Sequence, residues 1–343
     1  MATEYGLLLP HFGPETDRDR IIGGARRAEQ MGFDSVWVRD HLVFHPHGME
    51  GTDNTFIDPF VVLAALAGTT TKIKLGFGSL IPHRHPILLA LMLNSLGYMA
   101  GDRLLLSLGL GTFQEEFDAI GMGQWPRDEV VREQVAILRK ICNGDHASSE
   151  GKFYRFHDVG LKPKYPSKLE IWYAGATPAA VRRAVEYCDG WLPGRITVST
   201  YRKRVEKLRS GAAAQGRPRL HEGCIPITSI DEDRKTAIEK VNLEGLLSNA
   251  NKQKFWVKPA SGSFKTAEDL EGSFIAGSPE DVVNEVGKFL EIGIDHIVFD
   301  LRFRFEDWDR SIELLGTEVV PRLRKIQATA GPAGPAGPAG PAR

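Results

Sequence analysis

The sequence predicts a single (β/α)8 TIM barrel, and three observations favour this α/β fold class. Eight short β-rich segments alternate with helical segments, which is the pattern of a parallel sheet covered by helices. Segments 73–77 and 104–108 are mainly apolar rather than alternating, as strands covered on both faces require. The 343 residues accommodate one barrel of about 250 residues, with roughly 80 left for insertion segments at the βα loops.

The elements follow one another in a regular order. The expected strands cover residues 5–10, 35–39, 73–79, 104–110, 169–174, 190–192, 223–228 and 296–300. The expected helices cover residues 17–31, 58–70, 86–99, 127–141, 178–187, 200–214, 233–247, 279–291 and 306–327. Gly32 ends the first helix and Pro59 begins the second. Residues 143–168 and 249–272 are expected to be irregular. No G-x-G-x-x-G motif follows the first strand, which argues against an open dinucleotide-binding sheet.

The end of the chain differs from the rest in composition. Residues 331–342 are four G-P-A triplets, with the glycine spacing of collagen. Four triplets are too few for a stable triple helix, and nothing else in the chain repeats in this way. We therefore expect a barrel domain over residues 1–328 and a disordered tail over residues 329–343.

Charge and cysteine content exclude several functional classes. The formal net charge of -1 argues against a nucleic-acid binder and against a polybasic membrane-surface protein. The cysteines Cys142, Cys188 and Cys224 are odd in number and widely spaced, so neither a disulfide framework nor a zinc site is expected. The N-terminal residues lack the basic region of a signal peptide, and no apolar segment is long enough to cross a bilayer. These features predict a cytoplasmic protein.

A (β/α)8 barrel places its chemistry at the C-terminal ends of the strands. Asp40 and His41 directly follow the second strand, and a histidine there can act as an acid, a base or a hydrogen-bond donor. The alternative is that Asp40 caps a turn beside a loop histidine. Strand neighbours point to opposite faces, so the two side chains need not touch.

Two glycine-containing turns are candidates for cofactor contact. Residues 109–112 end the fourth strand, where glycine lets the backbone approach a flat ring or a phosphate closely. Residues 175–177 precede Pro178 and a helix whose N-terminal N–H groups could hold a phosphate. The alternative for Thr177 is a role only as the cap of that helix.

The sequence His83-Arg84-His85 also suggests metal ligation. With Asp300 at the end of the last strand, it would resemble the site of a metal-dependent amidohydrolase. Those enzymes carry the histidine pair on the first strand, whereas here it follows the third in a loop between two prolines. We therefore favour a solvated loop and expect no metal.

Five segments at successive strand ends carry a family resemblance. They are GFDSVWVRDHL (32–42), IKLGFGSLIPHRHPILLA (73–90), GDRLLLSLGLGTFQEEFDAIG (101–121), IWYAGATPAAVRRA (171–184) and CDGWLP (188–193). In this order they resemble the bacterial luciferase-like superfamily, and within it the branch that uses the deazaflavin coenzyme F420. The resemblance spans nearly the whole chain before the tail.

The resemblance implies roles for individual residues. His41 and Glu115 would be catalytic, His41 assisting proton or hydride chemistry and Glu115 donating a proton. A bulge after the third strand, often with a cis peptide, would back the cofactor ring. The implied cofactor-binding residues are Asp40, Ser79, Leu80, Gly111, Thr112, Gly175, Ala176 and Thr177.

The resemblance also implies a reaction. The expected function is hydride transfer between coenzyme F420 and a small organic substrate, because the cofactor supplies the electron chemistry and the protein orients it. The alternative is a two-component FMN-dependent monooxygenase that uses O2, although such enzymes more often have a Glu-His pair where this chain has Asp40-His41. A metal-dependent hydrolase and a non-catalytic flavin-binding barrel are more distant alternatives. A homodimer and a separate flavin or deazaflavin reductase are the expected partners.

Overall fold

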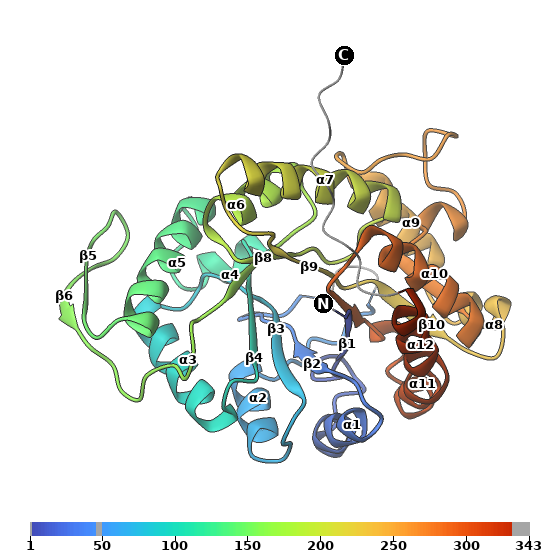
Figure 1. Ribbon diagram of the computed structural model, residues 1–343, viewed down its shortest axis with the longest axis horizontal. Helices are drawn as coiled ribbons and strands as arrows, with labels where there is room; N and C mark the ends of the chain where they lie inside the picture. Colours follow the sequence, from blue (N-terminus) through green and yellow to red (C-terminus); the bar gives the residue numbers. More distant parts are fainter. Residues whose placement is uncertain (1, 46–49, 331–343) are drawn as a thin grey trace.

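The computed structural model describes residues 2–45 and 50–330, and its centre is a closed barrel of eight parallel strands (Figure 1). Their order around the barrel is β1-β12-β9-β8-β7-β4-β3-β2. The strands are β1 (Glu4–Leu8), β2 (Ser35–Val38), β3 (Lys74–Leu80), β4 (Leu104–Leu108), β7 (Ile171–Ala174), β8 (Gly190–Leu192), β9 (His221–Cys224) and β12 (His296–Phe299). The predicted (β/α)8 barrel is confirmed.

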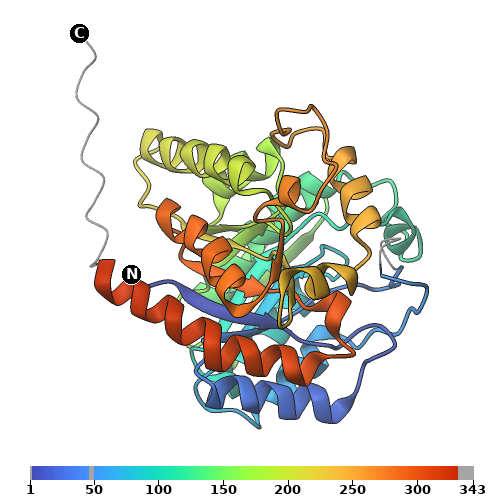
Figure 2. The ribbon, with the colours of Figure 1, turned by 90° about the vertical axis from the view of Figure 1, so that its right-hand side faces the viewer.

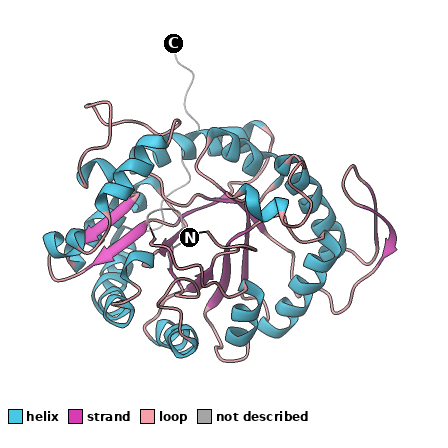
Figure 3. Ribbon diagram, turned by 180° about the vertical axis from the view of Figure 1, so that it is seen from behind, coloured by secondary structure: helices cyan, strands magenta, loops and turns pink. Residues whose placement is uncertain are grey.

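Helices form a ring outside the strands (Figure 3). The principal ones are α1 (Arg18–Gln30), α2 (Pro59–Ala67), α3 (Pro86–Ala100), α5 (Arg127–Asn143), α6 (Pro178–Tyr187), α7 (Val198–Ala214), α10 (Pro279–Ile292), α11 (Trp308–Leu314) and α12 (Val320–Ala330). The Asp17 side chain accepts a hydrogen bond from the Arg20 N–H and so caps α1. A π-helical turn, Leu315–Val319, joins α11 to α12, and this final helical segment packs beside α1 (Figure 2).

Trp37 fills the barrel interior beneath the C-terminal ends of the strands. A Cβ atom at Gly6 or Gly76 would overlap its indole ring, so these glycines make room for it. The Trp37 Nε1–H donates to Ser35 Oγ at 2.7 Å, and Ser35 Oγ lies 2.8 Å from His296 Nε2. The lower barrel is therefore a packed core, and a cavity opens at its upper end.

The insertions contain strands that were not predicted. The segment 143–168 forms an antiparallel hairpin, β5 (Ala147–Glu150) with β6 (Arg155–Val159). The predicted strand 223–228 was wrong in extent: β9 ends at Cys224, and after Pro226 the chain begins β10 (Ile227–Ile230). Proline lacks the N–H that a continuous ladder needs.

The strand β10 belongs to a small unit beside the barrel. It pairs in parallel with β11 (Phe274–Gly277), and the predicted helix 233–247 is divided into α8 (Arg234–Glu239) and α9 (Leu243–Lys252). These elements surround a second hydrophobic cluster that includes Trp256, Phe264 and Leu270. The segment after residue 249, expected to be irregular, thus contributes to a packed core.

The predicted tail lies almost entirely outside the described residues. Thr329 and Ala330 belong to α12, so the helix continues past the predicted boundary at residue 328. Within residues 2–45 and 50–330, no helix has the length and apolar character needed to cross a membrane.

Candidate functional site

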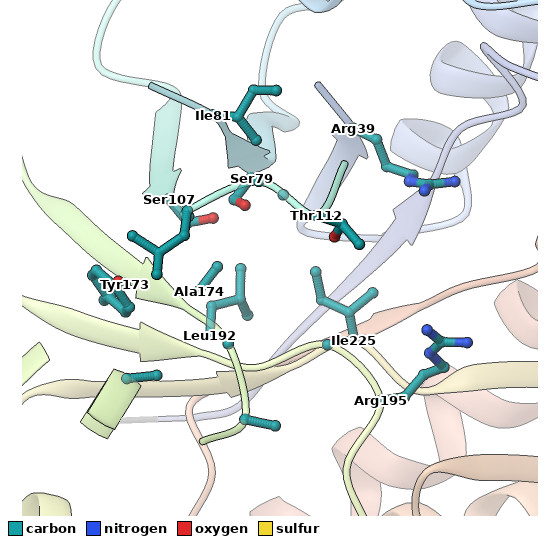
Figure 4. A pocket seen from close by; sticks show the side chains of 18 of the residues that line it. Arg39, Ser79, Ile81, Ser107, Thr112, Tyr173, Ala174, Leu192, Arg195 and Ile225 are labelled. Carbon is teal, nitrogen blue, oxygen red and sulfur yellow. The ribbon is translucent and has the colours of Figure 1, made fainter. Parts of the chain in front are cut away.

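A cavity of about 500 Å³ opens at the C-terminal ends of the barrel strands (Figure 4). Residues at the ends of β2, β3, β4, β7, β8 and β12 line its wall, and Asn249, Gln253 and Trp256 line it from the small unit. Active sites of (β/α)8 barrels lie at this end of the strands.

Asp40 ties the end of β2 to the loop after β3. Its Oδ2 accepts hydrogen bonds from the Ile81 N–H at 3.0 Å and from Arg84 Nη1 at 2.7 Å. Arg84 also donates to Asp58 Oδ2 at 2.8 Å. Asp40 Oδ1 is buried and has no hydrogen-bond partner among residues 2–45 and 50–330, although Asp40 lines the cavity. Such a buried acceptor can receive a hydrogen bond from a ligand.

His41 lies at the cavity between two unlike neighbours. Its Nδ1 is 3.2 Å from both carboxylate oxygens of Glu116, and its Nε2 is 3.3 Å from Arg39 Nη2. A carboxylate can only accept and a guanidinium can only donate, so the proton of the neutral ring is assigned to Nδ1 and the lone pair to Nε2. Burial lowers the pKa of His41 against the opposing effect of Glu116, which favours the neutral ring.

Glu116, rather than Glu115, is the carboxylate that contacts His41. Both lie on the short helix α4 (Gln114–Asp118), where neighbouring side chains point about 100° apart. Glu116 is fully buried and also accepts the N–H groups of Leu42 and Val43, whereas Glu115 is exposed and lies outside the cavity wall. Burial would raise the pKa of Glu116, but its hydrogen bonds outweigh burial and lower it.

The bulge expected after the third strand is present, but it lies within β3 near its C-terminal end. The Gly78–Ser79 peptide bond is cis, and the pairing of β3 with β4 shifts between Phe77 and Leu80. Ser79 lines the cavity, but Leu80 is fully buried and does not. Ile81 lines the wall in its place, because the bulge turns Leu80 into the core.

Both glycine-containing turns reach the cavity. Gly111 and Thr112 line it after β4, and Gly111 has a φ of 75°, which glycine adopts readily. Residues 175–177 line it after β7. Thr177 Oγ1 accepts the Ala180 N–H at 3.1 Å, so Thr177 does cap α6, and the N-terminus of that helix faces the same cavity. Arg183 of α6 lines it too and adds positive charge there.

Sequence reasoning missed an arginine cluster on the opposite part of the wall. It consists of Arg39, Arg195 and Arg302, together with the carboxylates Glu50 and Asp300. Arg302 Nε donates to Asp300 at 2.9 and 2.8 Å, and Arg302 also pairs with Glu50. Residues 193–195 and 300–304 stand at predicted strand ends, and their arginine content was the available signal.

The residues weighed as metal ligands, His83, His85 and Asp300, do not form a common ligand set within the described residues. The His85 ring accepts the Ile87 N–H and caps α3, while His83 Nδ1 lies 3.9 Å from Asp40 Oδ2. Asp300 is paired with Arg302. Among the residues that the structure describes, no group of three or more His, Cys, Asp or Glu side chains could hold a metal ion.

Comparison with known proteins identifies the family. The family described as luciferase-like monooxygenase matches residues 3–296, most of the chain. The chain belongs to the luciferase-like monooxygenase family. The resemblance found in the sequence is thereby confirmed at the family level.

Three known proteins are similar to this chain along almost their full length. The F420-dependent glucose-6-phosphate dehydrogenase of Mycolicibacterium gilvum is 28% identical over 338 residues, covering 94% of this chain and 98% of the relative. An F420-dependent secondary alcohol dehydrogenase, solved with an F420-acetone adduct, superposes with a TM-score of 0.79 at 22% identity, covering 94% of this chain and 100% of that one. The FMN-containing oxygenating constituent of 3,6-diketocamphane monooxygenase from Pseudomonas putida superposes with a TM-score of 0.77 at 21% identity, covering 94% and 99%.

Proposed function

We propose that this protein is an F420-dependent oxidoreductase that transfers a hydride between the deazaflavin and a small organic substrate. The observation that carries the proposal is the position of His41, which lines the cavity and whose Nδ1 lies 3.2 Å from both carboxylate oxygens of Glu116. Relatives named as F420-dependent dehydrogenases, matched over 94% of this chain, support the choice of cofactor.

The residues of the cavity fit a deazaflavin. Asp40 Oδ1 offers an unsatisfied buried acceptor, and Ser79 and Gly111 offer close backbone approach for a flat ring. Residues 175–177, the N-terminus of α6 and Arg183 would hold the phosphate of the cofactor. When bound, the cofactor supplies hydride chemistry at a ring carbon.

The chain itself handles the proton. In the oxidation direction, His41 Nε2 accepts the proton of a substrate hydroxyl, and in the reduction direction the protonated ring returns it. Glu116 keeps the ring oriented through Nδ1 and stabilises the positive charge that forms. We therefore assign the carboxylate role to Glu116 in place of Glu115.

The choice of cofactor is tested by binding. Dissociation constants for F420 and FMN are measured with the purified protein by fluorescence quenching, and F420 is expected to bind more tightly. The family description and the FMN-containing structure favour one second candidate, a monooxygenase that receives reduced FMN from a separate reductase. Tighter FMN binding, with reduced-FMN-dependent O2 consumption, would replace the first proposal with the second.

Two further properties belong to this proposal. The apolar residues Leu88, Leu91, Tyr98 and Met99 of α3, with Val61 of the adjacent α2, are exposed, and large exposed apolar patches mark association sites. We expect a homodimer formed through this α2–α3 face.

The three cysteines are buried and unpaired, which fits a reducing cytoplasm.

A further inference from the structure

His11 is a fully buried histidine to which the proposed reaction gives no role. It follows β1, and it is not among the described residues that line the cavity. Its Nε2 accepts a hydrogen bond from the backbone N–H of Arg39 at 2.8 Å. Accepting this bond requires a lone pair on Nε2, so the proton of the neutral ring is assigned to Nδ1. The imidazole of His11 thus holds the backbone two residues before His41.

The Arg39 N–H depends on this acceptor because the ladder between β1 and β2 is interrupted there. The Leu9 N–H still donates to the Trp37 carbonyl at 2.9 Å. The next bond of a regular parallel ladder would join the Arg39 N–H to the Leu9 carbonyl. That carbonyl instead accepts the His11 N–H at 3.0 Å, in a γ-turn centred on Pro10. The side chain of His11 therefore takes the place of a backbone acceptor at the end of the ladder.

The backbone of His11 holds the other end of the connection between β2 and α2. Its carbonyl accepts the Ile57 N–H at 3.0 Å, and Phe12 and Phe56 form an antiparallel bridge beside it. The ring meets Phe12 and Phe56 edge to face, at centroid distances of 5.2 and 5.0 Å. The connection is thus attached to His11 at Arg39, where it leaves β2, and again shortly before α2 begins.

Burial keeps the His11 ring in the form that can accept a hydrogen bond. It lowers the pKa of His11 to about 3, and the charges of Arg39 and His41 act in the same direction. The ring therefore stays neutral over the pH range in which His41 titrates. Its Nδ1 is buried and has no hydrogen-bond partner within residues 2–45 and 50–330. A buried donor without a partner is destabilising, so the Nε2 contact explains a histidine here better than packing does.

The contacts of His41 are sensitive to the position of the backbone at Arg39. The Nδ1 of His41 lies 3.2 Å from both carboxylate oxygens of Glu116, and its Nε2 lies 3.3 Å from Arg39 Nη2. These distances are at the long end of hydrogen bonding, so a displacement of about 1 Å away from Glu116 would break the contact. Displacements of this size are also enough to slow a reaction that depends on a positioned base.

We propose that His11 is a positioning residue for the proposed base: its imidazole fixes the backbone at Arg39, so that His41 keeps its contact with Glu116 and its place at the cavity. The importance of this for turnover rests on the proposed function of His41. The hold on the end of β2 is a property of the protein alone and can be measured without turnover.

The test compares two carboxamide variants that differ by one methylene group. His11→Gln can place its carbonyl oxygen near the position of Nε2 and still accept the Arg39 N–H, whereas the shorter His11→Asn cannot. Hydrogen exchange of the Arg39 amide is measured by NMR on the full chain. We expect exchange to quicken at least about tenfold in His11→Asn and to stay within about threefold of wild type in His11→Gln.

The titration of the His41 ring, also followed by NMR, is the readout that a purely structural role would not move. The charged groups near this ring are Arg39, Asp40 and Glu116, and burial is the largest cause of its lowered pKa. In His11→Asn the loosened ring should regain water, so its pKa should rise toward 6.5. In His11→Gln it should keep the wild-type value.

The matched control is His296→Gln. His296 is also buried and lies 2.8 Å from Ser35 Oγ, in the packed part of the barrel below the cavity. This variant should lower the midpoint of thermal unfolding and leave the His41 titration unchanged. If His11→Asn does not fold, His11→Leu repeats the test, because leucine also lacks the acceptor.

Each outcome has a defined meaning. An unchanged His41 titration in a folded His11→Asn or His11→Leu protein overturns the inference, and so does an equal shift in His296→Gln. The affinity of the wild-type protein for F420 is measured separately by fluorescence quenching. A shifted titration in His11→Asn, together with no F420 binding by the wild type, would support the hold on β2 and contradict the proposed function instead.

Discussion

Two neighbours of His41, Glu116 and Arg39, shift the pKa of its ring in opposite directions. Glu116 raises the pKa of the ring, whereas burial and Arg39 lower it, and the result lies below the usual value of 6.5. A base acts only in its neutral form, so a lowered pKa keeps His41 competent at neutral pH and moves its loss of activity to more acidic solution.

The first prediction concerns the pH profile of substrate oxidation. We expect kcat/KM to be level at neutral pH and to fall on the acid side, with a midpoint below pH 6.5. Glu116→Gln removes the group that raises the pKa, so the midpoint should move to still lower pH, with a fall in the plateau of about 10- to 100-fold from lost orientation.

Glu115→Gln is the matched control for this measurement. Its side chain is exposed and outside the cavity wall, so the wild-type profile should be retained. A midpoint that moved upward in Glu116→Gln, or an equal effect of Glu115→Gln, would contradict the assignment of Glu116.

Gly76 offers a second prediction at the level of a single residue. A Cβ atom there would overlap the indole ring of the fully buried Trp37, which has no space to move. We expect Gly76→Ala to lower the free energy of unfolding by about 1–3 kcal/mol, measured by urea denaturation. Gly23→Ala on α1 is the control, since nothing lies near its added methyl group and helix propensity favours alanine. Equal stabilities of the two variants would refute this account of Trp37.

At the scale of elements, helices and strands with a strong local sequence signal were predicted well, and those with a weak signal were not. Barrel strands such as β2 and β4 are largely apolar, and helices such as α6 begin at proline, so both were visible in the sequence. The hairpin strands β5 and β6 are mainly polar and partly exposed, and give no such signal. The strand β11 has four residues, and only its pairing with β10 makes it a strand.

The candidate site was likewise predictable in part: the residues at strand ends were found, and those placed by local geometry were not. Strand ends placed Asp40, His41 and residues 175–177 at one cavity, because the parallel barrel brings all such ends together. Sequence could not decide between Glu115 and Glu116, since the choice depends on the rotation of a short helix. The arginines at the predicted strand ends were visible in the sequence, but their meeting in one cluster was not, because the cluster unites residues from three loops.

The small unit gives a prediction about dynamics. Its core around Trp256 is a separate cluster, so its amides should open more readily than those of the barrel strands. In hydrogen–deuterium exchange, residues 243–270 should exchange faster than β3 and β4 in the free protein. They should become slower when F420 binds, because Asn249, Gln253 and Trp256 line the cavity. Protection confined to the strand ends would show that this unit does not respond to the cofactor.

At the scale of the whole molecule, the fold was predictable because the βα units repeat along nearly the entire chain, and the family was predictable because five segments at strand ends resemble it. The apolar α2–α3 face leads to a prediction at this scale. Tyr98 is 69% exposed, and Tyr98→Glu would place a charge in the expected dimer interface. The variant should sediment as a monomer while the wild-type protein sediments as a dimer. Ile326→Glu on α12 is the control and should remain dimeric. A monomeric wild-type protein would refute the proposed interface.

The order of strands in the barrel has a consequence for synthesis of the protein. The last strand, β12, lies between β1 and β9, so the first strand to be synthesised lacks one of its two neighbours until the final strand is made. Until residues 296–299 have left the ribosome, β1 and β9 each present an unpaired edge, and such edges promote aggregation. The same late segment delivers Asp300 and Arg302 to the cavity. A chain interrupted before β12 would therefore lack both the closing strand and part of the ligand pocket, and would be a natural target for chaperones.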